Sequence, residues 1–230
     1  MEFIACNAAN YREGRTQPVQ YIVMHYTANN GDTAKNNCDY YHRVGGLQAS
    51  AHYFVDEHGV MQSVREGDTA WHCGARAYWH PECRNANSIG IEMCSRKRAD
   101  GSYYIKPETV ANAAALAKDI MQRYGLDTDH VLRHYDVTGK RCPMPWVDDP
   151  AQWAAFKDML TPKNTTTVEE DDDMATRYNS VSELPEWAQE EAQRLVDRGA
   201  LLGDEHGNLD VTMDMLRTMI VCQRMIDGNK

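Results

Sequence analysis

Three residues of this sequence have the types and spacing of a zinc site. His25 lies at the end of an apolar, β-branched and aromatic stretch, residues 21–27, which is typical of a strand that holds a ligand rigidly. His134 follows a short apolar stretch, and Cys142 comes eight residues later in HYDVTGKRCP. Zinc binds nitrogen and sulfur ligands, and a catalytic site keeps a fourth position open for water. These three residues are therefore a candidate site with two nitrogens and one sulfur.

A second group of histidines and cysteines offers an alternative. His72, Cys73, His80 and Cys83 fall within about a dozen positions and suggest a structural zinc site, although their spacing matches no closed-site pattern. This mismatch favours a cleft-lining role for His72. A structural role for the histidines of the first group also stays open, because the chain contains nine histidines.

Glu92 and Lys140 are the charged candidates. Glu92 interrupts an apolar strand pattern, residues 88–94, where an ionised carboxylate is costly unless it is paired or bound to a metal. Alternation places the apolar side chains of this segment on one face and Glu92 on the other, beside Gly90, which leaves room for another group to approach. Lys140 lies two residues before Cys142 and could stabilise an oxyanion beside a metal. The alternative for Glu92 is a solvated face of the strand, and the alternative for Lys140 is a loop lysine without a function.

The elements that would position these residues mix strands with helices. Strand patterns cover residues 21–27, 88–94 and 131–133, and a turn at residues 57–59 indicates a hairpin. Helical patterns cover residues 32–44 and 107–124, both followed by glycine, and a last helix begins at Asp149-Pro150. Because strands and helices do not alternate strictly, the pattern predicts an α/β fold with a central mixed sheet flanked by helices.

Composition excludes several classes of protein. Hydrophobic residues make up 42% and charged residues 25% of the 230 residues, as in a globular protein, and no run of about 18 apolar residues could span a membrane. The net charge of −10 argues against nucleic-acid binding. The first residues lack the pattern of a signal peptide, which predicts synthesis in a cytoplasm. Seven scattered cysteines indicate free thiols or metal ligands more than disulfides.

The chain is expected to contain two domains and a linker. Residues 161–176 are rich in threonine and carboxylates and almost free of apolar residues, which predicts a flexible acidic linker. The larger domain, which carries the candidate zinc site, would then cover residues 1–160, and a small helical module would cover residues 177–230. In this module, helical patterns run from Leu184 to Arg198 and again after Thr212, and their apolar stripe favours a small core over a binding surface.

Four separated segments carry a family resemblance. In chain order they are YIVMHYTAN, SAHYFVDEHGVMQSVREGDTAWHCG, NANSIGIEMC and HYDVTGKRCP. Together they resemble the type 2 N-acetylmuramoyl-L-alanine amidases, relatives of the peptidoglycan recognition proteins, and most closely the branch of phage endolysins and Gram-positive autolysins. The resemblance covers roughly the first 160 residues. It implies a zinc enzyme that hydrolyses the amide bond between N-acetylmuramic acid and L-alanine in bacterial peptidoglycan.

The resemblance also implies roles for individual residues. It makes zinc ligands of the first group, His25, His134 and Cys142. It gives Glu92 the role of the catalytic carboxylate, which takes a proton from the water that zinc activates and passes it to the leaving nitrogen. Lys140 would stabilise the transition state.

Four further residues are expected at the substrate site. Tyr53 stands near the place of a tyrosine that assists catalysis in the family, although Glu92 is the better candidate for that role. From their positions in the chain, Trp71, His72 and Tyr78 are expected to line the groove that binds glycan and peptide.

The C-terminal module resembles a single S-layer-homology-type module. The order WA, helix, G-N-L-D, helix carries this resemblance, and the segment DMLR replaces the usual T-R-x-E-type segment. Such modules bind secondary cell-wall polymers, so the resemblance implies a wall polymer as the ligand. Pairing of the module with a second copy in a dimer is the alternative.

Together these interpretations predict a phage or prophage endolysin. Such a protein is made in the host cytoplasm without a signal peptide and acts on the cell wall after release. One alternative is a non-catalytic recognition protein that binds peptidoglycan, but such relatives lose the cysteine ligand that Cys142 supplies here. Another alternative is an amide hydrolase that acts on soluble anhydro-muropeptides, which the wall-directed C-terminal module disfavours.

Overall fold

The computed structural model describes residues 1–161, 177–204, 208–212, 215–216 and 219. The chain forms two compact units, Met1–Pro162 and Lys163–Lys230. The acidic linker predicted over residues 161–176 lies outside the described residues except for Thr161, and so does most of the helix predicted after Thr212.

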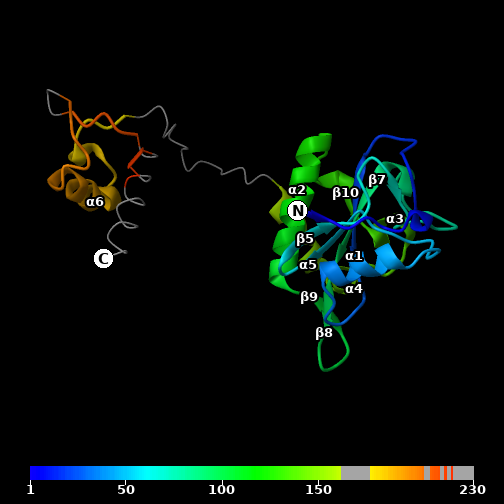
Figure 1. Ribbon diagram of the computed structural model, residues 1–230. Coiled ribbons are helices and arrows are strands. Elements are labelled where there is room, and N and C mark those ends of the chain that lie inside the picture. The colour runs from blue at the N-terminus through cyan, green and yellow to red at the C-terminus, as the bar shows by residue number, and fades with distance from the viewer. Residues whose placement is uncertain (162–176, 205–207, 213–214, 217–218, 220–230) are drawn as a thin grey trace. The chain divides into compact units, whose positions relative to one another are not determined.

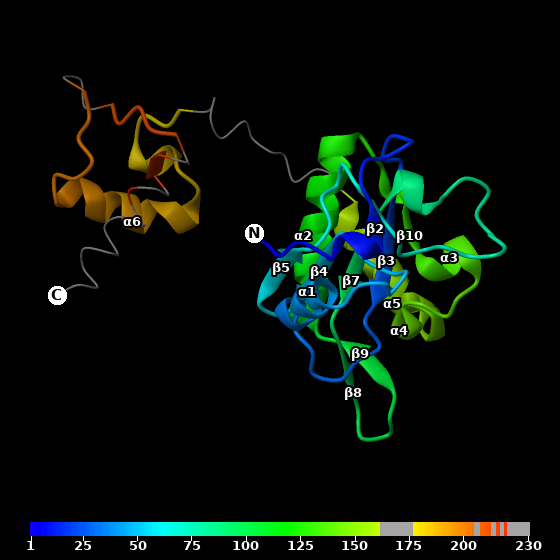
Figure 2. The ribbon, with the colours of Figure 1, turned by 45° about the vertical axis from the view of Figure 1, so that its right-hand side comes forward.

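A six-stranded mixed sheet forms the centre of the first unit, with the strand order β1-β5-β4-β7-β3-β10. Figure 2 shows β5, β4, β7, β3 and β10 following one another across the sheet. β4 and β5 form an antiparallel hairpin, whereas β3 runs parallel to both β7 and β10. The strands are β1 (Glu2–Phe3), β3 (Tyr21–Tyr26), β4 (Tyr53–Asp56), β5 (Gly59–Gln62), β7 (Ser88–Met93) and β10 (Val131–Arg133).

Two small sheets, five α-helices and the short 3₁₀ helices η1 (Ala8–Asn10), η2 (Asn85–Asn87) and η3 (Thr128–His130) complete this unit. Figure 1 labels the five α-helices. β2 (Tyr11–Arg12) pairs with β6 (Thr69–Ala70), and β8 (Ser95–Lys97) pairs with β9 (Tyr103–Ile105). The helices are α1 (Ala34–Arg43), α2 (Pro107–Tyr124), α3 (His134–Thr138), α4 (Met144–Asp148) and α5 (Pro150–Leu160). The α/β fold with a central mixed sheet, predicted from the sequence, is confirmed.

Local sequence signals explain where the long helices begin and end. Thr33 forms a capping box with Asn36 at the start of α1, which satisfies free backbone N–H groups there. α2 begins with a proline in its first turn and ends before Gly125, which has a left-handed conformation with φ 64°. Asp149 caps α5, because its side chain accepts a hydrogen bond from the N–H of Ala151.

One face of the sheet packs against α2, α4 and α5 and buries almost only apolar side chains. From β3, Ile22 and Met24 point to this face, where they join side chains of β7 such as Ile91. The helices contribute Ile120, Trp146 and other residues to the same core, which is the largest in the unit. Burying a side chain of this size contributes about 1.5–3 kcal/mol, so this face supplies much of the stability of the fold.

The opposite face packs against α1, α3 and the segment of residues 71–87. Its apolar contacts form separate smaller clusters, one around Phe54 and α1 and another around Val23 and α3. Buried polar groups lie on the same face, among them His25 and His52. Because successive side chains of a strand point to opposite faces, β3 supplies both the apolar core and this polar side.

The second unit contains a small apolar core around α6 (Glu186–Asp197). Leu184, Ala188, Ala192 and Leu195 pack there with Leu201, Val211 and Leu216. A short 3₁₀ helix, η4 (Val181–Glu183), precedes α6, and an isolated β-bridge joins Tyr178 to Val211. The apolar stripe predicted for this module is therefore used as a core among the described residues.

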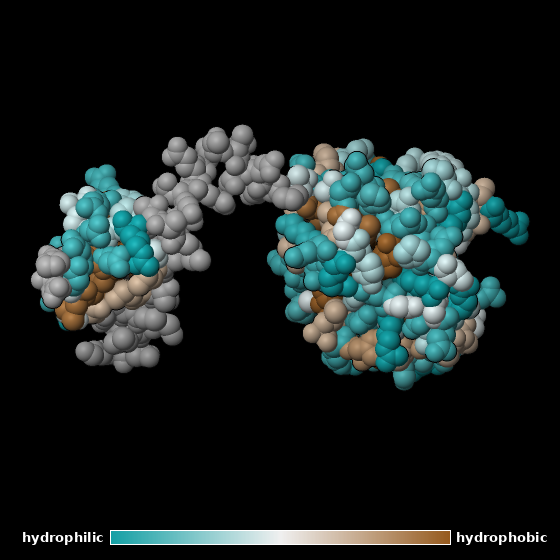
Figure 3. Space-filling model, turned by 90° about the horizontal axis from the view of Figure 1, so that it is seen from above, coloured by the Kyte–Doolittle hydropathy of each residue, from teal (hydrophilic) through white to brown (hydrophobic). Residues whose placement is uncertain are grey.

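The face of the first unit drawn in Figure 3 is mostly hydrophilic, with apolar residues in small separate groups. Among the helices of the described residues, none is both long enough and apolar enough to cross a lipid bilayer.

Candidate metal centre

Three structural elements bring His25, His134 and Cys142 together. His25 lies near the carboxyl end of β3, an interior strand between β7 and β10, and points to the polar face of the sheet. His134 is the first residue of α3, directly after the neighbouring strand β10. The following loop folds back, because the N–H of Tyr135 donates a hydrogen bond to the carbonyl of Cys142 at 2.9 Å. This return of the chain places Cys142 beside the two histidines, as the sequence predicted.

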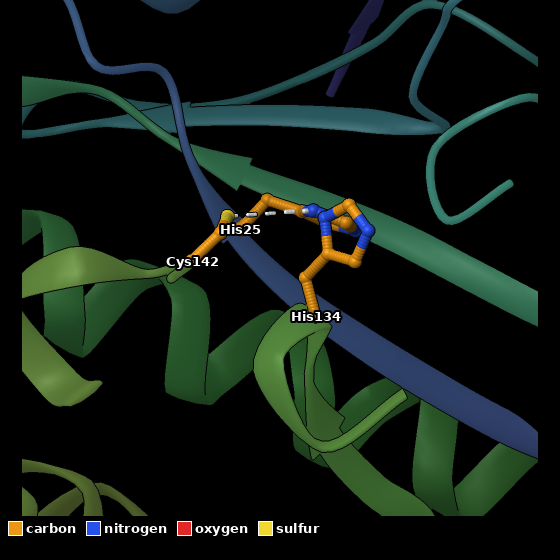
Figure 4. A group of neighbouring side chains, drawn as sticks. All are labelled: His25, His134 and Cys142. Atoms are coloured by element: carbon orange, nitrogen blue, oxygen red, sulfur yellow. Dashed lines mark hydrogen bonds between the residues drawn. The ribbon is translucent and has the colours of Figure 1, made fainter. Parts of the chain in front are cut away.

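The three side chains converge on one point (Figure 4). One ligand atom from each residue lies within 4.8 Å of the others. Nδ1 of His25 is 3.7 Å from Sγ of Cys142, and the rings of His25 and His134 are 4.7 Å apart between centroids. Among the described residues this is the only group of three or more such side chains close enough to hold a metal ion.

Burial controls the ionisation of the three residues. Their exposed fractions are 2%, 5% and 4% for His25, His134 and Cys142. Burial lowers the pKa of His25 well below its usual value and that of His134 to about 3, so both imidazoles are neutral at pH 7, as metal ligands must be. Burial raises the pKa of the Cys142 thiol to about 12, so a metal that binds there must displace a proton.

An unsatisfied atom also points to a metal. Nδ1 of His134 is buried and has no hydrogen-bond partner among the described residues. An unpaired buried polar atom is costly, and it needs a physical explanation such as a bound ion. Two neutral imidazoles and one cysteine, which binds as the thiolate, are also the kind of ligand set that zinc binds. The residues therefore fit a zinc ion.

A cavity of about 1020 Å³ borders one of the three candidate ligands. His134 lines it together with Trp71, His72 and Lys140. The side chain of Lys140 is exposed, so its ammonium group is free to meet a molecule in the cavity. Trp71, His72 and Lys140, which were expected to contact the substrate, thus line the same cavity as the candidate metal ligand.

Glu92 lies next to His25 across the sheet. The two residues are register partners in the parallel pair of β3 and β7. Oε2 of Glu92 is buried without a hydrogen-bond partner among the described residues, and burial raises the pKa of this carboxyl to about 8, against an opposing effect of Lys140. Glu92 lines a second cavity, of about 440 Å³, together with Asp32 and Tyr40. Its position beside the candidate ligands fits a group that exchanges protons.

A family model described as N-acetylmuramoyl-L-alanine amidase matches residues 15–145, which is more than half of the 230 residues and includes all three candidate ligands. The chain belongs to this amidase family.

Individual relatives agree with this assignment. The N-acetylmuramoyl-L-alanine amidase CwlL of Bacillus licheniformis is 42% identical over 148 residues, which cover 60% of this chain and 40% of that protein. The chain therefore spans less than half the length of this curated relative. The structure of the catalytic domain of XlyA matches with a TM-score of 0.56 and 29% identity, covering 70% of this chain and 99% of that domain. A structure described as a mutant endolysin from Bacillus subtilis matches with a TM-score of 0.56 and 30% identity, over 70% of this chain and 99% of that one.

Two residues expected at the substrate site of this amidase-family chain lie elsewhere. Tyr53 points to the apolar face of the sheet, is 2% exposed, and donates a hydrogen bond from its hydroxyl to Glu66 at 2.7 Å. The expectation for Tyr53 is therefore wrong, because alternation along β4 turns its side chain away from the cavity. Tyr78 does not border the large cavity; its ring packs under Arg84 and beside the cluster around Val23.

The alternative zinc cluster does not form among the described residues. Cys73 and Cys83 are fully buried in the apolar cluster around Val23. Nδ1 of His80 accepts hydrogen bonds from the backbone N–H groups of Glu82 and Cys83, so it holds a turn. His72 is directed to His25 instead, with its Nδ1 3.1 Å from Nε2 of His25.

Sequence reasoning missed this contact of His72 and the role of its neighbour Ser88. The signal was Gly90, whose missing side chain was expected to leave room beside Glu92. The ring of His72 fills that room, since a Cβ atom at position 90 would lie 2.5 Å from Cγ of His72. Oγ of Ser88 lies 3.1 Å from Nε2 of the His72 ring.

Proposed function

We propose that this chain is a zinc-dependent amidase that hydrolyses the bond between N-acetylmuramic acid and L-alanine in peptidoglycan. The observation that carries the proposal is the convergence of His25, His134 and Cys142 beside a cavity of about 1020 Å³. The match of residues 15–145 to the amidase family supports the choice of bond.

In this proposal His25, His134 and Cys142 hold the zinc ion. A bound zinc ion polarises the carbonyl group of the scissile amide and makes water a nucleophile near neutral pH. The chain places the ligands before the metal arrives: His25 lies on β3, His134 begins α3, and Cys142 lies on the loop that is tied back to α3. The cavity beside His134 receives the lactyl and peptide portions of the substrate.

Glu92 and Lys140 act on the substrate. Glu92 takes the proton of the attacking water and delivers it to the alanine nitrogen when the amide bond breaks. A pKa of about 8, set by burial, suits a carboxyl group that must first accept and then donate a proton near neutral pH. Lys140, exposed at the cavity wall, donates hydrogen bonds to the negative oxygen that develops on the carbonyl carbon.

The test is mass spectrometry of Gram-positive peptidoglycan after digestion. The wild-type chain should release stem peptides that begin with a free alanine amine. His134→Ala and a chelated sample should release none, while both still fold as judged by circular dichroism. If the wild type binds zinc and stays on the wall but releases no peptide, the chain is a recognition protein and the enzyme proposal fails.

We also propose that the substrate is the intact wall and that the chain acts as a lysin after release from the cytoplasm in which it is made. The structural similarity to an endolysin from Bacillus subtilis supports this role. Expression in Gram-positive cells should cause lysis only after the membrane is permeabilised. A chain that cuts soluble anhydro-muropeptides but leaves sacculi intact would overturn the lysin proposal and leave the amidase proposal standing.

For the second unit we propose binding to a secondary cell-wall polymer, as its resemblance to S-layer-homology modules implies. The described part of this unit, with its core around α6, is compatible with a small folded module. The full-length His134→Ala variant should sediment with intact sacculi and remain soluble with sacculi stripped of these polymers. Concentration-dependent dimerisation without polymer binding would favour pairing between copies instead.

A further inference from the structure

A chain of hydrogen bonds runs from His25 away from the candidate metal centre. Nε2 of His25 lies 3.1 Å from Nδ1 of His72. Nε2 of His72 lies 3.1 Å from Oγ of Ser88, and this hydroxyl donates to the backbone carbonyl of Arg84 at 2.7 Å. Three consecutive hydrogen bonds thus connect a candidate metal ligand to the main chain.

The backbone carbonyl of Arg84, at the end of this series of three hydrogen bonds, sets the donor and the acceptor in each of them. A carbonyl oxygen only accepts, so the hydroxyl hydrogen of Ser88 is committed to Arg84. Oγ of Ser88 is then the acceptor for His72, whose Nε2 carries the hydrogen and whose Nδ1 has the lone pair. Nδ1 of His72 in turn accepts from Nε2–H of His25.

Because Nε2 of His25 donates its hydrogen to His72, the ring lone pair of His25 lies on Nδ1. That atom is the nitrogen that lies 3.7 Å from Sγ of Cys142. A neutral histidine carries a hydrogen on only one of its two ring nitrogens. Fixing this hydrogen on Nε2 makes Nδ1 the only atom of the His25 side chain that is able to bind a metal. Without this fixation, the tautomer with a hydrogen on Nδ1 would point an N–H group at the metal position.

The pose of the His72 ring is fixed by its surroundings. The ring lies directly over Gly90 of β7, where a Cβ atom would approach its Cγ to 2.5 Å. Its backbone is held by Asn85, whose Oδ1 accepts from the N–H groups of His72 and Cys73 at 3.1 and 2.8 Å. His72 therefore meets His25 with one ring nitrogen in a defined place.

We propose that His72 is a positioning residue that holds His25 in the tautomer with its hydrogen on Nε2, so that Nδ1 is presented to the metal. This role differs from lining the cavity, and it rests on the proposed function in so far as a metal binds at His25. Partners of this kind, which orient a ligand from behind, typically change metal affinity by 10- to 100-fold when they are lost.

The first test compares the zinc affinity of full-length variants by competition with a chromogenic chelator. His72→Ala should weaken zinc binding about 10- to 100-fold, because Nε2–H of His25 loses its acceptor. His72→Asn should retain most of the affinity, because an amide oxygen can take the place of Nδ1 as the acceptor. His58→Ala, an exposed histidine in the turn between β4 and β5, is the matched control and should change nothing. Equal affinities for His72→Ala and the wild type would overturn the inference.

A second variant displaces the ring without deleting it. Gly90→Ala changes none of the residues His25, His72 and Ser88, but its added Cβ atom pushes the His72 ring out of its position. It should lower zinc affinity as His72→Ala does, and the double variant should be no weaker than either single variant, since both remove the same contact. Losses that multiply in the double variant would contradict a shared cause.

The decisive measurement reads the tautomers directly. In the metal-free wild type labelled with ¹⁵N-histidine, long-range NMR correlations should show His25 and His72 both protonated on Nε2. Ser88→Ala should give a mixture of tautomers for His72. A hydrogen on Nδ1 of His25 in the wild type would overturn the inference and leave the proposed function intact. A wild type that binds no zinc would instead overturn the proposed function, while the tautomer result still judges this inference.

Discussion

The two faces of the central sheet bury different kinds of side chain, although the same strands supply both. Towards α2 and α5, β3 presents Ile22 and Met24 to a continuous apolar core. Towards α1 and α3, it presents Val23 and His25, and His25 continues into a network of buried polar groups. Alternation along each strand makes this division possible within a thin layer.

The apolar face therefore stabilises the fold, whereas the polar face carries the groups that could do chemistry. Apolar burial stabilises the fold without further conditions, whereas a buried polar group costs free energy unless it is hydrogen-bonded or bound to an ion. His52 shows the satisfied case, since its Nδ1 accepts from the N–H of Gly90 at 3.0 Å and its Nε2 contacts Arg15 at 2.8 Å. Nδ1 of His134 and Oε2 of Glu92, next to the candidate metal position, have no hydrogen-bond partner in the part of the chain that the structure describes. We therefore expect substitutions on the apolar face to lower the stability of the fold, and substitutions on the polar face to lower activity.

The largest effect is expected from Cys142→Ser. Loss of the sulfur ligand should lower kcat/KM at least about a thousandfold, because a catalytic metal contributes several kcal/mol and each 1.4 kcal/mol is a factor of ten. Zinc content by elemental analysis should fall in parallel. The urea midpoint of the metal-free variant should stay close to that of the wild type. An active variant with no zinc would remove the metal from the proposed function.

Glu92→Gln should have the next largest effect on activity. The amide keeps the shape of the side chain but neither accepts nor delivers the proton, so kcat should fall by about 10²–10⁴. Zinc content should remain at the wild-type level, because Glu92 is not among the three candidate ligands. Steady-state kinetics on soluble wall fragments would measure this. A loss of zinc together with activity would mean that Glu92 acts as a ligand.

Ile120→Ala tests the apolar face. Ile120 is fully buried in α2, so the change should lower the free energy of unfolding by about 2–5 kcal/mol through lost burial and a cavity. Denaturation with urea would measure the loss. At a temperature where the variant is folded, its zinc affinity and kcat should equal those of the wild type. A lowered kcat in the folded variant would show that the two faces are coupled.

Counted for one histidine and one pH unit, the smallest effect is expected from acid. Burial lowers the pKa values of His25, His52 and His134, so the folded chain keeps them neutral while the unfolded chain protonates them below about pH 6.5. The unfolded state then binds more protons, and the metal-free chain should lose up to about 1.4 kcal/mol per pH unit for each histidine as pH falls from 6.5.

Glu92 opposes this trend. Its pKa is raised to about 8, so above its unfolded value the folded chain retains a proton that the unfolded chain releases. Stability from this group therefore rises as pH falls from 8, and Glu92→Gln should make the acid loss of stability steeper. Urea denaturation at pH 7, 6 and 5 would measure both slopes. A flat profile in the wild type would show that the buried histidines are not neutral in the folded state.

Much of the fold was predictable because its signals are local. The helix predicted over residues 107–124 is α2, with the same bounds, since a proline at its start and Gly125 at its end act within one turn. The strand that carries His25 was identified from its β-branched and aromatic residues and from their alternation. The candidate ligands were identified because family motifs preserve their spacing along the chain.

Tertiary structure alone decided how the polar side of the sheet is connected. His72 and His25 are 47 residues apart, and their contact depends on strand register, on the course of residues 71–87 and on the space over Gly90. The same dependence on strand register placed Glu92 beside His25. The sequence by itself determined which residues alternate, where helices end and which side chains are able to bind zinc, because these properties act between near neighbours. Which nitrogen of His25 faces Cys142 is set by hydrogen bonds between distant segments, and these exist only when the sheet and its covering loop are assembled.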